Sequence, residues 1–249
     1  MLKALRLSAL LALVLASLLA TTVRAQDAAE YGDVFEGEMT EDEYEFEITF
    51  EGEEGDIIAL VLTPIIAEDA FISDLTSPIM MLEFDGDTVA DTTSQFVFGG
   101  PLSLVTVLED SGEYTLFITR EDGSSGDSVG EFEVAFNSVE ILEIEEPVTG
   151  SAETDGGVNY YAVQSDSDWG ISYLKADGDL DVEIAINRLD ENSSGLTRVA
   201  YASGSELTEA AFGILEGGDV YIVTVGEPAF AFSFSPEDAE FQLELLPFE

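Results

Sequence analysis

The sequence contains no cysteine and no histidine, and it has only seven lysine and arginine residues among 249. Without cysteine, no disulfide supports the fold. Without histidine, no Ser-His-Asp or Cys-His catalytic arrangement exists, and the common zinc-ligand sets are missing as well. Burial of apolar side chains must therefore stabilise the fold, and the usual nucleophilic and zinc chemistries are excluded.

Basic residues are scarce relative to acidic ones. The chain has 53 Asp and Glu, and three of its basic residues, Lys3, Arg6 and Arg24, lie in an N-terminal segment that we expect to be removed. The mature chain then keeps four basic residues and a formal charge of −49. Nucleic acids and anionic membrane surfaces require cationic groups on a protein, so we expect neither as a partner. Cations, a cationic surface or a saline medium suit this charge better.

The N-terminus has the layout of a secretory signal peptide. A basic start, Met1–Arg6, precedes an apolar run from Leu7 to Ala20, and Val23-Arg24-Ala25 supplies a cleavage site before Gln26. The alternative is an uncleaved membrane anchor, but the run is shorter than the roughly 20 residues that a spanning helix needs. We therefore expect residues 1–25 to be cleaved and the protein to be secreted or otherwise extracytoplasmic.

Apolar residues in the rest of the chain follow a strand period. Three segments, Tyr44–Phe50, Tyr114–Thr119 and Glu131–Phe136, alternate apolar and polar residues, which places one face on a core and the other in water. Two further segments, Ile57–Leu62 and Tyr221–Val225, are apolar almost throughout, which is typical of strands covered on both sides. This patterning, with 46% apolar residues, argues against disorder despite the charge.

Turn residues and an internal repeat define the expected architecture. Asp-Gly and Gly-Gly turns separate the strand-like segments, and no amphipathic helical stretch follows the signal peptide. Segments of the first half recur in the second half with a period of about 110 residues, so the repeat indicates tandem domains. The matched segments are Val34–Gly37 with Pro147–Gly150, Tyr44–Phe50 with Asn159–Val163, Leu108–Leu116 with Leu215–Val223, and the Phe132 strand with Glu240–Leu245.

We therefore predict an all-β protein of two tandem antiparallel β-sandwich domains of jelly-roll type. The first domain is expected over residues 31–137 and the second over residues 147–249. Residues 138–146 are expected to link them, although Val139–Ile144 could instead extend the last strand of the first domain.

Each unit resembles the bacterial pre-peptidase C-terminal domain. The first unit has the opening Gly37, the Tyr44-Glu45-Phe46 strand, the Gly55-Asp56 turn, the Pro78–Asp85 strand and the Leu108–Ile118 segment of that family. The likeness covers most of residues 31–137 and is weaker over 147–247, where Leu180–Ile186 replaces the proline strand. It implies a jelly-roll-like sandwich of secreted proteins, usually found beside a catalytic domain. Some relatives bind calcium or help to attach an enzyme to its substrate or to a surface.

Calcium is the sharpest ligand hypothesis that the residues themselves support. Hard cations bind clustered carboxylate oxygens. Asp177, Asp179 and Asp181 occupy alternate positions, and Asp85 and Asp87 flank a turn glycine. The first group does not fit the EF-hand pattern, and the alternative is that all five aspartates build hairpin turns and solvate the surface.

Two other hypotheses about function remain open from the sequence alone. Exposed aromatic residues could bind carbohydrate or a protein surface, although at strand spacing they are more often part of a core. With 53 acidic residues, a pair of carboxylates suited to a hydrolase could arise by chance. We expect no enzymatic activity. The aromatic candidates are Tyr160, Tyr161, Trp169, Tyr173 and Tyr201 in the second unit, with the alternating Phe230–Phe234 segment as a core face.

Overall fold

The computed structural model describes residues 28–67, 70, 72–93, 95, 100–152, 158–164, 169–178, 183–189, 195–202, 208–226 and 239–247. The expected signal peptide (residues 1–25) and the Phe230–Phe234 segment lie outside them. Within these ranges the chain forms β-strands and one short 3-10 turn, η1 (Gly123–Ser125), with no α-helix. The prediction of an all-β fold is confirmed. The described part contains no helix of a length and hydropathy that could span a membrane.

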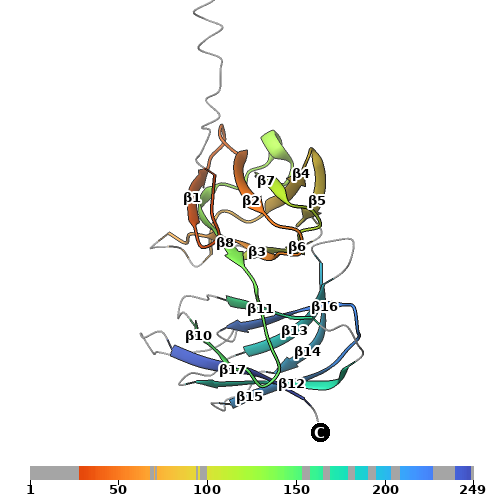
Figure 1. The fold of residues 1–249 in the computed structure, drawn as a ribbon. Coiled ribbons are helices and arrows are strands. Elements are labelled where there is room, and N and C mark those ends of the chain that lie inside the picture. The colour runs from red at the N-terminus through yellow and green to blue at the C-terminus, as the bar shows by residue number, and fades with distance from the viewer. Residues whose placement is uncertain are drawn as a thin grey trace, which may run out of the picture.

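The first sandwich consists of two four-stranded antiparallel sheets packed face to face (Figure 1). One sheet has the order β1-β8-β3-β6 and the other has the order β2-β7-β4-β5. This interleaving, in which consecutive strands alternate between the sheets except for the β4–β5 hairpin, is that of a jelly roll. The strands are β1 Val34–Met39, β2 Phe46–Gly52, β3 Ile57–Pro64, β4 Pro78–Phe84, β5 Asp87–Asp91, β6 Leu102–Val107, β7 Gly112–Arg120 and β8 Gly130–Ser138.

The second sandwich repeats this topology. Its sheets have the orders β10-β17-β12-β15 and β14-β13-β16-β11-β9, in which β9 adds in parallel to β11 and all other neighbours are antiparallel. Apart from β9, each strand has a counterpart in the first sandwich. The strands are β9 Glu140–Ile141, β10 Val148–Ala152, β11 Val158–Gln164, β12 Trp169–Gly178, β13 Glu183–Leu189, β14 Leu196–Ala202, β15 Thr208–Leu215, β16 Val220–Gly226 and β17 Ala239–Pro247.

The repeat extends to individual contacts. In the first sandwich Gly37 pairs with Phe132, and in the second Gly150 pairs with Phe241. A Cβ on either glycine would lie only 2.5 Å or 2.3 Å from the facing ring. Glycine is therefore required at both positions because the aromatic ring lies against the strand backbone.

Equivalent tyrosines mark the same turn in both sandwiches. The Tyr114 hydroxyl donates to the Asp110 carbonyl at 2.8 Å, and the Tyr221 hydroxyl accepts from the Glu216 amide at 2.7 Å. Both tyrosines are buried at the start of the strand that follows the turn. They align β7 of the first sandwich with β16 of the second, so equivalent residues of the two strands can be compared position by position.

Each sandwich has its own apolar core, and a third cluster lies between the two sandwiches. That cluster, which we call the junction cluster, joins the outer face of β3 and β6 to the outer face of β11 and β16 (Figure 1). All its buried members are less than 7% exposed. They are Ile57, Ala59 and Val105 from the first sandwich, Val139 from the connecting segment, and Ala162 and Ile222 from the second sandwich.

The connecting segment is hydrogen-bonded to both sandwiches. The Val139 amide donates to the Ile57 carbonyl at 2.8 Å, and the Leu142 amide donates to the Ala162 carbonyl at 2.7 Å. Between them, β9 pairs with β11. The Ser103 and Tyr160 hydroxyls share a further hydrogen bond across the junction. The prediction that Ile57–Leu62 is covered on both sides is confirmed, because the second sandwich covers the face that the first leaves open.

Candidate functional site

Glutamates lie directly opposite one another on the outer faces of the first sandwich. Each of these side chains is exposed, in agreement with the alternation of the sequence. Side chains at such paired positions are neighbours, and like charges there are destabilising. A nearby cation would relieve this repulsion. The pairs are Glu36–Glu133 and Glu38–Glu131 between β1 and β8, and Glu51–Glu113 between β2 and β7.

The basic residue of the first sandwich does not neutralise these acids. Arg120 is 2% exposed, and its guanidinium lies 4.8 Å from the centre of the Tyr44 ring. Among the residues that the structure describes, it donates only to backbone carbonyls, which satisfies a buried charge without a carboxylate. Arg120 therefore holds together the loops at this end of the sandwich. The acceptors are the carbonyls of Gly123 (2.8 Å), Thr40 (3.1 Å), Ser128 (3.2 Å) and Glu41 (3.3 Å).

The structure places Asp85 and Asp87 at one hairpin turn and leaves the side chains of the other predicted calcium ligands undescribed. Asp85 and Gly86 form an exposed two-residue turn between β4 and β5, with φ values of 49° and 86°. Asp87 begins β5 beside this turn. Asp177 belongs to β12, but its side chain, Asp179 and Asp181 lie outside the description. In the described ranges, no group of three or more acidic side chains is placed to hold a metal ion.

The predicted aromatic residues have different environments. Tyr161 is 7% exposed and belongs to the second core, whereas Tyr160 packs at the junction. Tyr201 on the edge strand β14 is 47% exposed, and its hydroxyl donates to Glu183 at 2.9 Å. The Arg198 guanidinium lies 4.9 Å from the centre of the Tyr201 ring. The side chains of Trp169 and Tyr173 lie outside the description.

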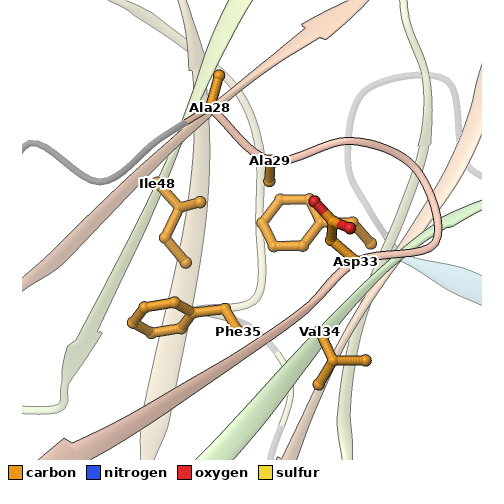
Figure 2. Close-up of a pocket in the computed structure, with 7 residues that line it drawn as sticks. Ala28, Ala29, Asp33, Val34, Phe35 and Ile48 are labelled. Carbon is orange, nitrogen blue, oxygen red and sulfur yellow. The ribbon is translucent and has the colours of Figure 1, made fainter.

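An open hollow of about 240 Å³ borders the first core. Figure 2 shows Ile48 and Phe35 beside it, with the segment from Ala28 to Asp33 running around the opposite side. Asp33 is its one ionisable residue, and the Asp33 carboxylate accepts the Glu30 amide at 2.9 Å. This carboxylate closes a local turn, so the hollow has an apolar wall and no arrangement of groups suited to catalysis.

The displaced pKa values of the described residues all belong to tyrosines and are all raised. Burial is the first cause in each case, and for Tyr31 the hydrogen bond to Asp56 at 2.9 Å adds to it. A tyrosine with a raised pKa keeps its proton at neutral pH and is a poor base. The tyrosines are Tyr31, Tyr114, Tyr160, Tyr161 and Tyr221.

Sequence reasoning missed an apolar centre on the outer face of the β2-β7-β4-β5 sheet. Met81 of β4 lies opposite Phe117 of β7, and both point away from the core because their strand neighbours are buried in it. Both side chains are half-buried. On the other side of β7, Glu47 of β2 lies opposite Phe117. The signal was present in the alternation of β7, where an outward phenylalanine interrupts polar residues.

Only the comparison with solved structures found proteins similar to this chain. No protein-family model and no curated protein matches this chain. A candidate secreted protein from Eubacterium rectale is similar over 86% of this chain and 74% of its own, with 12% identity and a TM-score of 0.30. The CBM22-1-CBM22-2 tandem domain of Paenibacillus barcinonensis Xyn10C is similar over 90% and 100%, with 9% identity and a TM-score of 0.25.

The CUB1-EGF-CUB2 domain of human MASP-1/3 is similar over 85% of this chain and 99% of its own, with 8% identity and a TM-score of 0.23. Likenesses this distant transfer no ligand and no activity to this chain.

Proposed function

We propose that this chain is an exported, non-catalytic β-sandwich module that acts at the cell envelope or in the medium. Its acidic strand faces bind cations or a cationic surface. The observation that carries this proposal is the direct opposition of glutamates on paired strands, with Glu36–Glu133 beside Glu38–Glu131 on one ladder. These pairs lower the stability of the isolated molecule, and a bound or condensed cation offsets that cost.

Two finer statements accompany this proposal. The two sandwiches are divergent members of the pre-peptidase C-terminal type, and a structural calcium ion binds at the Asp177, Asp179 and Asp181 segment. The support for the first is the set of motif residues in the sequence. The support for the second is the alternate spacing of three aspartates beside a glycine turn.

Thermal unfolding of residues 26–249 tests these proposals. We would compare Tm in EDTA, in millimolar calcium and in NaCl of rising ionic strength. A general cation-binding surface predicts a Tm that rises with ionic strength whichever cation is used. A calcium site predicts a rise at millimolar calcium that sodium of equal ionic strength does not reproduce. A Tm that responds to neither salt would contradict the acidic-face proposal.

A matched pair of variants shows whether the opposed glutamates are responsible. Replacing Glu36 and Glu133 by glutamine removes one opposed pair, so Tm at low salt should rise and its salt dependence should fall. Replacing Glu43 and Glu109, which are exposed in loops, changes the net charge equally without removing a cross-strand pair. Equal effects of the two changes would mean that net charge alone matters.

A second candidate function is carbohydrate binding at Tyr201. The exposed Tyr201 ring, with Arg198 beside it and Glu183 at its hydroxyl, combines a stacking surface with hydrogen-bonding groups. Native gels containing neutral polysaccharides would test it, because a bound chain retards this strongly charged protein. Retardation that Tyr201→Ala abolishes would support carbohydrate binding, and unchanged migration on each polysaccharide would contradict it.

A further inference from the structure

We infer that the outer face of the β2-β7-β4-β5 sheet is a docking surface for a basic polypeptide. We call it the distal face, defined by the outward residues Glu47, Glu51, Met81, Glu83, Glu113, Thr115 and Phe117. The inference rests on the proposed function and deepens it, because it assigns the cationic partner to one face and adds an apolar anchor.

The same sheet of the second sandwich is already used for docking within this molecule. The outer face of β16 and β11 packs against the first sandwich through Val220, Ile222 and Ala162. The equivalent tyrosines place Glu113 of β7 at the position of Val220, and Thr115 at the position of Ile222. The distal face is therefore the counterpart of a docking face, with acidic and polar residues in place of apolar ones.

The distal face retains an apolar centre. Met81 and Phe117 lie opposite one another on neighbouring strands, half-buried and outside the core. Ile79, also half-buried, lies next to Met81 on the same side of β4. A contiguous patch of methionine and aromatic side chains in the middle of a face is typical of the centre of a protein interface.

Acidic residues flank this centre along β2 and at one end of β4 and β7. Glu47 lies opposite Phe117, Glu83 lies opposite Thr115, and Glu51 lies opposite Glu113. A partner with lysine or arginine side chains around an apolar residue would complement both the rim and the centre. A second copy of this chain does not fit, because two molecules with a formal charge near −49 repel each other.

The test uses two labelled synthetic peptides of equal charge and fluorescence anisotropy in moderate salt. One peptide alternates lysine and leucine, and the other alternates lysine and serine. We expect the lysine–leucine peptide to bind residues 26–249 about tenfold more tightly. We expect Phe117→Ala to weaken its binding at least about fivefold, which corresponds to the threshold of a significant interface residue. Met81→Ala should act in the same direction.

Charge variants then separate the distal face from the general surface. Glu47→Gln with Glu113→Gln should weaken binding of both peptides, whereas Glu43→Gln with Glu109→Gln removes the same charge from exposed loops and should change it less than about twofold. Circular dichroism would verify that each variant is folded.

Three outcomes would overturn the inference. An equal loss of peptide affinity in the two charge variants, or an unchanged affinity in Phe117→Ala and Met81→Ala, would mean that the peptides are attracted to the acidic surface as a whole. The proposed function would then stay in place. No binding of either peptide at low salt would contradict the proposed function as well. Self-association in the absence of peptide, measured by sedimentation and removed by Phe117→Ala, would mean that a second copy covers the distal face.

Discussion

Ile57→Ala tests whether the junction cluster joins the two sandwiches into one cooperative unit. Ile57 is 4% exposed, although it points outward from the core of its own sandwich. Its burial is therefore due to the contact with the second sandwich. If the two sandwiches separated in solution, the Ile57 side chain would lie on the surface, and its truncation would change the free energy of unfolding by no more than about 0.5 kcal/mol.

The magnitude expected for a docked junction is larger. Isoleucine loses three carbon groups on becoming alanine, and each contributes about 0.8 kcal/mol when buried. The cavity left behind adds to this transfer cost, so we expect a loss of about 2–4 kcal/mol. Val34→Ala is the matched control, because Val34 is 58% exposed on β1 and its truncation should cost less than about 0.5 kcal/mol.

Urea unfolding would measure how much Ile57→Ala lowers the free energy of unfolding, and hydrogen-exchange mass spectrometry would show which strands it destabilises. In a cooperative unit, Ile57→Ala should speed exchange in β16 of the second sandwich as well as in β3. Combining it with Ile222→Ala should give a coupling energy above about 0.5 kcal/mol, because both side chains belong to the junction cluster. Two separate unfolding transitions, or additive effects confined to each sandwich, would refute the reasoning.

Three further predictions concern single residues. Burial raises the pKa of Tyr160, and its hydrogen bond to Ser103 partly offsets that rise. The contribution of Tyr160 to the free energy of unfolding is therefore complete below the unfolded pKa near 10 and is lost as pH rises through the higher folded pKa. Tyr160→Phe should reduce the alkaline loss of stability by up to about 1.4 kcal/mol per pH unit, measured by urea unfolding at a series of pH values. Gly37→Ala should cost about 1–3 kcal/mol in urea unfolding because its Cβ would lie 2.5 Å from the Phe132 ring, and Phe132→Leu should recover part of that loss if the clash is the cause. Arg120→Met should cost at least about 2 kcal/mol in thermal unfolding because it leaves backbone carbonyls without donors, and a neutral result would mean that water replaces the guanidinium.

Much of the fold followed from local pattern. Alternation in Tyr44–Phe50 and Glu131–Phe136 indicated which side chains face the core, and turn residues such as Asp85-Gly86 marked the hairpins. The repeat could be seen because glycine and tyrosine recur at positions where backbone contacts require them. The candidate sites were less predictable, since neighbouring acids in a sequence this acidic do not reveal which carboxylates meet in space.

The sequence by itself determined that this is an acidic, all-β protein with an internal repeat and without histidine or cysteine. These properties depend only on composition and on the local pattern of apolar and polar residues, which includes strands with apolar residues on both faces. Only the tertiary structure decided what covers the second side of those strands. Ile57 and Ala59 look like core residues in either arrangement, but their partners Ala162 and Ile222 lie far along the chain. Strand register likewise decided that Glu36 faces Glu133 and that Met81 faces Phe117, because cross-strand neighbours depend on pairing between distant segments.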